Sequence, residues 1–351
     1  TQRVDRPIAA SLPRVAVIGA GIGGLAAART LADHGIDVSI FDKSRGVGGR
    51  TATRRVDLVG DSHSVQFDHG AQYFTARDSR FCRLVNSWIH DGLAEPWMGR
   101  IVQVNNQGQI KAEKNGTPRY VGVPGMTAVA KHLAQGLAIH VGTPIVQLHQ
   151  MSDHWMVENA EGQLLGPFDV VLCNCPPPQT SKLIDGHTQL ADLVRTVQMR
   201  PCWALMVADP SLTQIPFDGA FVTDSPLSWI ASDNATPGRE NPIDAAPESW
   251  VVHASADWSE QHIHESPTEI IEKLLPKFGS IVGKAIEQPL YVNAHRWMYA
   301  IPKTPLDQEC LFDPTTGIGA CGDWCGGSRV EAAYLSGISL AGRLLRHYTL
   351  D

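Results

Sequence analysis

Residues 14–42 read RVAVIGAGIGGLAAARTLADHGIDVSIFD. The apolar, β-branched run RVAVI predicts a buried parallel strand. Gly23–His34, rich in alanine and leucine, predicts a helix that Gly35 ends. A second strand over Ile36–Phe41 completes strand, glycine turn, helix and strand within about thirty residues. This spacing is that of a βαβ unit.

The turn after the first strand carries the pattern G-x-G-x-x-G at Gly19, Gly21 and Gly24. The first glycine permits a tight turn, the second lets a pyrophosphate approach the backbone, and the third lets helix and strand pack closely. Asp42 ends the next strand, where a carboxylate can accept both hydroxyls of an adenosine ribose. The pattern predicts a dinucleotide cofactor, and NAD and FAD share this much of it.

A second glycine-rich segment, Arg45-Gly46-Val47-Gly48-Gly49-Arg50, lies just past the acid. Flexible backbone beside guanidinium groups suits the pyrophosphate and flavin end, so the segment favours FAD. Together with Asp42-Lys43-Ser44 it resembles the signature of the flavin amine oxidase superfamily, which includes phytoene desaturase and protoporphyrinogen oxidase relatives. The resemblance implies an α/β fold: a Rossmann-like FAD-binding domain of the GR2, or amine-oxidase, type with an inserted α+β substrate domain on a mixed sheet.

The resemblance continues along the chain. Gly125-Met126 and the helix after it are similar to the family's Gly-Gly-Met-x-x-Leu segment, although Pro124 replaces the first glycine. Thr143–Val146 corresponds to the strand whose backbone meets adenine, and Cys175-Pro176 ends the next one. Ala320-Cys321-Gly322-Asp323 looks like the C-terminal FAD motif, with Asp323 placed for the ribityl chain and Val330 opening a helix toward the flavin. The residues expected to bind FAD are Gly19, Gly21, Gly24, Asp42, Lys43, Arg45, Gly49, Arg50, Gly70, Ala71, Val146, Gly322, Asp323 and Val330.

Other elements follow from local patterns. We expect strands at Val65–Phe74 (broken by Gly70), Ala138–Val141, Asp169–Cys173, Trp250–His253, Pro289–His295 and Gly317–Cys321, a hairpin over Ile145–Asn159, and helices at Arg80–Asp91, Thr127–Gln135 and Val330–His347. Because dinucleotide-type elements recur at the beginning, middle and end, the FAD-binding domain is expected to be discontinuous, over 14–60, 120–182 and 311–351. Residues 61–119 and 183–310 would form the substrate domain, and 1–13 a disordered leader.

Two long strings narrow the resemblance within the superfamily. Asp68–Asp78 and His295–Ala300 resemble the renalase family, particularly its bacterial members, and Cys321–Cys325 and Arg329–Glu331 join them. The resemblance implies an FAD-dependent oxidase that converts 2- and 6-dihydro isomers of NAD(P)H to NAD(P)+ and reduces O2 to H2O2. A dihydropyridine needs no base, because losing hydride gives a pyridinium directly.

Four residues are expected to act on the substrate. By analogy His253 would hydrogen-bond a carboxamide or set the polarity near the flavin, and Trp297 would provide a stacking face. Tyr299 and Gln72 complete the set. His295 and Trp297 share parity in an extended strand, so both are expected to face the flavin while Arg296 faces away. His69 is expected either to support the site residues from behind or to have a structural role. The remaining aromatic candidates, expected in the core or a lid, are Trp203, Trp229 and Trp258.

Composition excludes several other classes. A net charge of −7 without any long Lys/Arg run argues against nucleic acid and anionic membrane as partners, leaving a small molecule and O2. No apolar stretch reaches the roughly 18 residues that span a bilayer. Seven cysteines without a C-x-x-C pair or zinc-type spacing indicate a reducing cytoplasm and no metal site. The sequence leaves the oligomeric state open.

The chemistry has alternatives. No Cys-x4-Cys pair follows the glycine loop and no second G-x-G-x-x-G occurs, which disfavours a disulfide reductase and a separate NAD(P)H domain. Cys325 is the nearest candidate for covalent flavin attachment, and the residues after it do not match that pattern, so FAD is expected to be non-covalent. An amine oxidase or desaturase on the same scaffold, and a flavin-bound redox sensor without turnover, remain as competing hypotheses.

Overall fold

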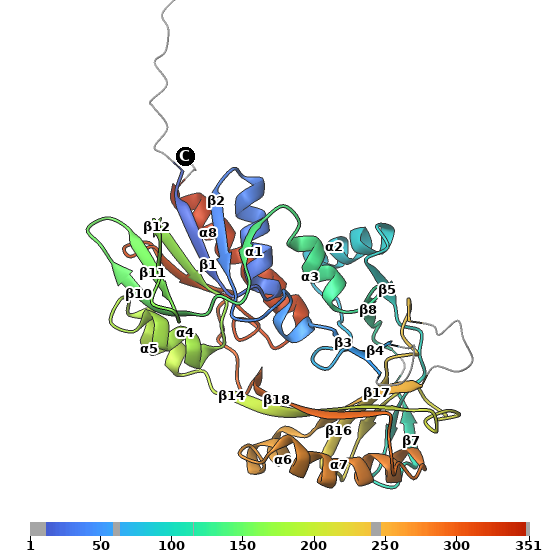
Figure 1. Cartoon of the computed structure of the whole chain (residues 1–351). Coiled ribbons are helices and arrows are strands. Elements are labelled where there is room, and N and C mark those ends of the chain that lie inside the picture. The colour runs from blue at the N-terminus through green and yellow to red at the C-terminus, as the bar shows by residue number, and fades with distance from the viewer. Residues whose placement is uncertain (1–11, 59–63, 115, 240–246, 349–351) are drawn as a thin grey trace, which may run out of the picture.

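Two large sheets form the molecule, and they lie at opposite ends of the view in Figure 1. The computed structural model describes residues 12–58, 64–114, 116–239 and 247–348. Most of the expected leader 1–13 and the expected domain boundary at residue 60 therefore lie outside the described residues.

The first sheet has six strands and confirms the predicted βαβ unit. β1 (Arg14–Ile18) pairs in parallel with β2 (Asp37–Phe41) and with β13 (Val170–Cys173) on its other side. The order across the sheet is β19 (Leu311–Asp313), β20 (Ile318–Ala320), β13, β1, β2 and β9 (Ala138–His140), and β19 alone runs antiparallel to its neighbour. Strands from three distant parts of the sequence thus meet in one parallel sheet.

Alternation along β1 explains why both faces of this sheet are covered. Val15 and Val17 lie in the core with α1 (Ile22–Asp33) and α8 (Val330–Tyr348). Ala16 and Ile18 point to the other face, where they pack with a three-stranded antiparallel sheet and two helices. The elements on that face are β10 (Ile145–Gln150), β11 (Trp155–Asn159), β12 (Leu164–Phe168), α4 (Pro177–Ile184) and α5 (Leu190–Arg195).

The first and last helices pack directly against each other. A Cβ built on Gly337 of α8 would lie 2.1 Å from the carbonyl oxygen of Gly23 in α1, so only glycine allows this approach. Figure 1 shows the consequence, with α8 in red beside the blue β1 and α1. The two ends of the described chain therefore belong to one core.

The second sheet has seven strands and is mainly antiparallel. Its order is β18 (Tyr291–Pro302), β14 (Met199–Asp209), β17 (Glu248–Ala254), β16 (Leu227–Ser232), β15 (Gly219–Val222), β6 (Ile101–Val104) and β7 (Ile110–Glu113). Trp250 and Val252 of β17 pack with α7 (Pro267–Val282), which covers the outer face beside α6 (Ala256–Gln261). By the period of two, Val251 and His253 point to the opposite face, toward the first sheet.

Short elements lie beside and between the two sheets. They are η1 (Gly49–Thr51), the pairs β3 (Arg54–Asp57) with β4 (Ser64–Phe67) and β5 (Ala94–Pro96) with β8 (Tyr120–Gly122), and the helices α2 (Ser79–His90) and α3 (Thr127–Leu133). The predicted strand Val65–Phe74 is wrong beyond Phe67, because the chain turns where the Asp68 carboxylate accepts hydrogen bonds from Thr53 and Met126. Only Phe74 returns to an isolated bridge, with Tyr120.

The remaining predicted elements appear within a few residues of their expected bounds, except that β18 continues to Pro302. We propose the discontinuous division into an FAD-binding domain (14–60, 120–182 and 311–351) and a substrate domain (61–119 and 183–310). The packing of Ala191 and Val194 beneath the first sheet moves the proposed boundary from residue 182 to the end of α5. None of the helices within the described ranges is long and apolar enough to cross a bilayer.

Candidate active site

The glycine turn between β1 and α1 is tight because another residue fills the space beside it. Gly19 has a φ of +107°, and a Cβ there would lie 2.8 Å from the carbonyl oxygen of Asn174. A Cβ on Gly24 would lie 2.1 Å from the carbonyl oxygen of Gly19. The glycines therefore serve the backbone itself, and they keep the N-terminus of α1 open to an anion.

Asn174 is a residue that the sequence analysis did not single out. It follows β13 at the carboxyl end of the sheet, its Oδ1 is 2.8 Å from the Cβ position of Gly21, and its Nδ2 donates to the carbonyl oxygen of Cys321 at 3.0 Å. One amide side chain thus joins the first glycine loop to the segment after β20. Its place after a strand adjacent to β1 was a signal that could have found it.

Asp42 lies at the end of β2, as predicted, and is buried. Its carboxylate accepts from the backbone N–H of Ala20 at 2.6 Å and of Ser44 at 2.7 Å. An ionised carboxylate has about four lone-pair sites, so each oxygen keeps one for a ribose hydroxyl. The fixed geometry fits the role expected for this acid.

The second glycine segment lies against the first. Gly48 N–H donates to the carbonyl oxygen of Ala20 at 2.9 Å, and Gly21 and Gly48 form a parallel bridge. Gly49, with a φ of +54°, begins η1 beside them. The side chains of Lys43 and Arg45 are exposed next to this segment. The backbone that could cradle a pyrophosphate therefore comes from both segments.

Segment 142–146 lies over the same acid. Gly142 N–H donates to the carbonyl oxygen of Ser44, and Thr143 N–H donates to that of Asp42, both at 2.8 Å. Val146 follows in β10 with 47% of its surface exposed. These contacts place the strand expected to meet adenine beside the carboxylate expected to hold the ribose.

Arg50 and Asp323, both expected to contact the cofactor, contact each other. The Arg50 guanidinium donates to the two carboxylate oxygens of Asp323 at 2.8 and 2.6 Å, and also to the carbonyl oxygen of Ala300 at 2.7 Å. A planar fork of this kind fixes both groups. The pair therefore ties the second glycine segment to the C-terminal motif and to β18.

Gly70 and Ala71 pass Arg50 on its backbone side. Ala71 N–H donates to the carbonyl oxygen of Arg50 at 2.8 Å, and a Cβ on Gly70 would lie 2.1 Å from that oxygen. The close approach at Gly70 is to the Arg50 backbone, and the contact with FAD expected for Gly70 stays a prediction.

The N-terminus of α8 carries its own acid. Val330 begins the helix, and the buried Glu331 accepts from the backbone N–H of Arg77 at 2.6 Å and of Asp78 at 2.7 Å. Gly322 N–H donates to the Ser336 hydroxyl one turn further on, at 3.0 Å. The helix is therefore fixed to the segment before α2 and to the turn after β20.

Three histidines and a tryptophan meet on the inner face of the second sheet. The carbonyl oxygen of His69 accepts from Trp297 Nε1 at 2.9 Å and lies 3.1 Å from His253 Nε2. The His69 ring lies 5.0 Å from Trp297 and 4.9 Å from His295. Arg296 is exposed, as predicted from the parity of β18. The structure thus brings His253 and Trp297 together around His69, whose backbone carbonyl contacts both side chains.

The histidines are neutral near pH 7. Burial, His295 and Arg54 lower the pKa of His69 to about 3, and burial and Arg54 lower the pKa of His295 to about 4. Burial also lowers the pKa of His253. The three imidazoles are therefore hydrogen-bonding groups at neutral pH, and those of His69 and His295 are very weak bases.

Gln72 lies beside this group and is buried. Its Oε1 accepts from Trp229 Nε1, while its Nε2 has no hydrogen-bond partner in the described part of the chain. Tyr299 shares the parity of His295 and Trp297 on β18 and is partly buried. Trp229, expected only as core or lid, therefore holds a candidate site residue in place.

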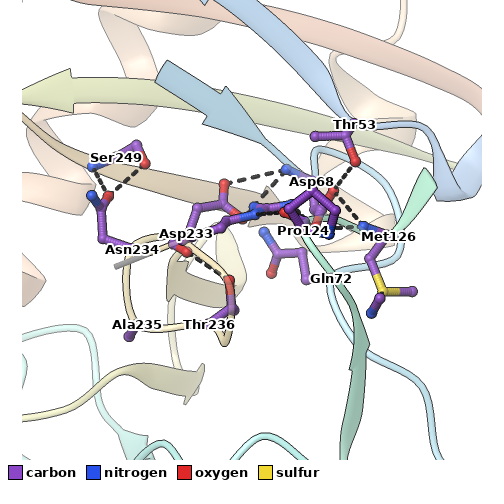
Figure 2. Close-up of polar contacts among 12 residues, drawn as sticks. Thr53, Asp68, Gln72, Pro124, Met126, Asp233, Asn234, Ala235, Thr236 and Ser249 are labelled. Carbon is purple, nitrogen blue, oxygen red and sulfur yellow. Dashed lines mark hydrogen bonds and ion pairs between the residues drawn. The ribbon is translucent and has the colours of Figure 1, made fainter. Parts of the chain in front are cut away.

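A buried charge network holds the segment that carries His69 and Gln72. Arg239 donates to Asp68 at 2.5 Å, to Asp233 at 2.7 Å and to the carbonyl oxygen of Pro124 at 2.8 Å. All three charged side chains are at most 5% exposed. Figure 2 shows Asp68 and Asp233 at the centre of these contacts. The network joins β4, the approach to α3 and the end of β16, and no local sequence pattern signalled it.

Two observations of this structure show that the residues present fit FAD. Glycine backbone of two segments surrounds the N-terminus of α1, and Asp42 is fixed at the end of β2. Arg50, which follows this loop, pairs with Asp323 and contacts the carbonyl oxygen of Ala300 in β18. The same strand carries part of the polar, partly aromatic face of the second sheet. Fold and site thus define a dinucleotide-binding flavoprotein of the α/β class.

A family model described as "Flavin containing amine oxidoreductase" matches residues 107–345, and one described as "NAD(P)-binding Rossmann-like domain" matches residues 17–88. The first match covers more than half of the chain, which therefore belongs to the flavin-containing amine oxidoreductase family. It is an FAD-dependent oxidoreductase.

Individual relatives are distant. The chain is 54% identical over 44 residues to the zeta-carotene-forming phytoene desaturase of Myxococcus xanthus, which is 12% of this chain and only 8% of that relative's length. A putative protoporphyrinogen oxidase from Exiguobacterium sp. 255-15 has a similar structure, with a TM-score of 0.75 and 12% identity over 95% of this chain and 99% of that one. The cyclohexylamine oxidase of Brevibacterium oxydans IH-35A is similar with a TM-score of 0.72 and 12% identity, over 95% of this chain and 98% of that one. These structural likenesses show the fold.

Proposed function

We propose that this protein is a renalase-like oxidase that converts 2- and 6-dihydro isomers of NAD(P)H to NAD(P)+, with O2 reduced to H2O2. FAD, when bound, accepts the hydride and passes the electrons to O2. The residues that bind it in this proposal are the two glycine segments with Asp42, Lys43, Arg45 and Arg50, together with Gly70, Ala71, Val146, Gly322, Asp323 and Val330. The attachment is non-covalent, which the burial of Cys325 supports, since burial raises the pKa of its thiol.

The single observation that carries the substrate class is the set of neutral histidines around Trp297. An amine has a pKa near 10 and must lose a proton before it can give up hydride, so its site needs a base or the free amine. Imidazoles with pKa values of about 3 and 4 are too weak for that task. A dihydropyridine loses hydride and becomes a pyridinium without proton transfer, so hydrogen-bonding groups and a stacking ring suffice.

The residues have distinct roles in this proposal. His253, fixed by the His69 carbonyl oxygen, orients the carboxamide of the donor ring, and Trp297 stacks on that ring. Gln72 offers the free donors of its Nε2 to the same ligand. Tyr299 closes the side of the site formed by β18. The charge that acts on His69 and His295 is the cation Arg54, which disfavours an ammonium group here.

Anaerobic stopped-flow reduction of the bound flavin tests this function. We expect 2- or 6-dihydro-NAD(P) to bleach the flavin at a rate that is flat between about pH 6 and pH 8, because His69 and His295 stay neutral throughout and burial lowers the pKa of His253. Primary amines serve as the comparison. If amines bleach the flavin rapidly, with a rate that rises with pH, while the dihydronicotinamides do not, the chain is an amine oxidase and the proposal is wrong.

A further inference from the structure

The face that carries the histidines continues across most of the second sheet. Directly opposite residues of neighbouring strands lie on the same face. Following the register from the edge strand β18 through β14, β17, β16 and β15 gives a continuous row, which consists of His295, Ala204, His253, Trp229 and Phe221. The polar end of the candidate site is therefore joined to an aromatic end on one surface.

Rings gather at the aromatic end. Phe221 lies 4.7 Å from Trp229, and Tyr73 lies 5.4 Å from Trp229 between ring centroids. Trp229 and Trp97 are buried, whereas Phe221 and Tyr73 remain partly exposed. Tyr73 directly follows Gln72, whose Nε2 is unpartnered although the residue is only 6% exposed. The partly exposed ring of Tyr73 therefore lies next to Gln72 Nε2, a buried donor without a hydrogen-bond partner among the described residues.

Arg119 lies over both accessible rings. Its guanidinium carbon is 5.4 Å from the centroid of Tyr73 and 5.9 Å from that of Phe221. The guanidinium makes one hydrogen bond in the described ranges, a donation to the carbonyl oxygen of Lys114 at 3.1 Å. Within those ranges no carboxylate lies within 4.0 Å of it, whereas Arg50, Arg100 and Arg239 each pair with one. The Arg119 guanidinium is held in place by the rings of Tyr73 and Phe221, and most of its five N–H donors have no partner among the described residues.

The distance between the two ends fits a particular kind of ligand. Neighbouring strands lie about 4.8 Å apart, so Phe221 is about 10 Å from His253 and about 19 Å from His295 along the row. A donor ring bound beside His253 and Trp297, at the histidine end of the row, would direct a group attached through a pentose toward Arg119. A guanidinium held by two rings, without an anion of its own, suits phosphate.

We propose that Arg119, held by Tyr73 and Phe221, is the phosphate-recognition residue of this site, so that the enzyme prefers phosphorylated pyridine nucleosides over their unphosphorylated forms. This inference rests on the proposed function, since it takes the donor ring to lie at the histidine end. It adds a specificity residue that neither the glycine motifs nor the family resemblance indicated.

The test compares dihydronicotinamide mononucleotide with the corresponding riboside, which lacks the phosphate, as reductants of the holoenzyme. We expect Arg119→Gln to raise the KM of the mononucleotide about 10- to 100-fold, because the charge-assisted hydrogen bonds to its phosphate are lost. The KM of the riboside and the limiting rate of flavin reduction should stay unchanged. Arg119→Lys, which keeps the charge without the plane, should recover part of the affinity for the mononucleotide.

Arg83→Gln is the matched control, since Arg83 is exposed on α2 and its loss changes the net charge equally. Equal increases in KM for both reductants in Arg119→Gln would overturn the inference, because they would mark Arg119 as a structural residue. Inorganic pyrophosphate, titrated against the oxidised holoenzyme, separates the two proposals. If neither reductant bleaches the wild-type flavin, the proposed function fails, and loss of pyrophosphate binding in Arg119→Gln but not in Arg83→Gln still supports the anion site.

Discussion

At the scale of single residues, Asp233 is in an unusual electrostatic position. It is 3% exposed and shares the guanidinium of Arg239 with Asp68, so two carboxylates lie beside one cation. Burial raises the pKa of Asp233 to about 7, although Arg239 opposes the rise. Burial also raises the pKa of Asp68. The folded protein therefore holds a proton here that the unfolded chain releases near its ordinary pKa of 3.8.

The sign of the pH dependence follows from that proton. Between about pH 4 and pH 7 the folded state binds more protons than the unfolded state, so the Asp233 contribution to stability falls as pH rises. Asp233→Asn keeps the shape and removes the titration. We expect the free energy of unfolding of Asp233→Asn, relative to that of the wild type, to rise by more than about 1 kcal/mol between pH 5 and pH 8. Urea denaturation at both pH values measures this, and parallel curves for the two proteins would contradict it.

Sequence patterns located those single residues whose structural cause is local. Gly19 and Asp42 were predicted because a turn and a strand end lie within a few residues of them. Asn174 and Arg239 were missed because their partners are 147 and 171 residues away in the sequence. Gly70 lies against the backbone of Arg50, a partner that no local pattern indicates.

At the scale of elements, β18 shows how a strand builds the site. Its alternation places His295, Trp297 and Tyr299 on one side and Arg296 and Met298 on the other. The expected strand ended at His295, although the shared parity of His295 and Trp297 already required extended backbone beyond it. In the structure β14 supplies the missing pairing, as far as Pro302.

Trp297→Phe tests the side of β18 that faces the candidate site. The variant keeps a ring and loses the Nε1 donor that fixes the His69 carbonyl oxygen at 2.9 Å. We expect flavin reduction by the dihydronicotinamide to slow about 10- to 100-fold, with FAD still bound, because the donor ring loses its alignment. Met298→Leu, on the exposed side of the same strand, is the control. Equal reduction rates for Trp297→Phe and the wild type would remove Trp297 from the site.

Helices and strands also differ in how well they can be predicted from the sequence. The βαβ unit was predicted because its period, glycines and length agree. Helix α7 was not predicted, although Ser266 and Glu269 form a capping box at its start, because Pro276 lies within its span and interrupts the helical pattern. Packing against Trp250 and Val252 of the second sheet favours the helix despite that proline.

At the scale of the whole molecule, the first and last helices must fit each other for the cofactor loop to form. Gly337→Ala places a Cβ 2.1 Å from the carbonyl oxygen of Gly23, next to the glycine loop. We expect a loss of about 1–3 kcal/mol in unfolding free energy and a lower flavin-to-protein absorbance ratio.

Gly342→Ala is the control in the same helix, because a Cβ there meets only Arg346 Nη1 at 3.6 Å. Since alanine favours helix over glycine, this control should be neutral or up to about 1 kcal/mol more stable. A Gly337→Ala protein that melts and binds FAD like the control would show that α8 can move away without disturbing the loop.

The contact between Asn174 and Cys321 has a consequence for synthesis. During translation the glycine loop and Asp42 leave the ribosome early, whereas Cys321, Asp323 and α8 emerge roughly three hundred residues later. Until then Arg50 lacks its partner Asp323, and Gly23 lacks the helix α8 that packs beside it. We therefore expect the nascent chain to capture flavin only after Asp323 and α8 have left the ribosome.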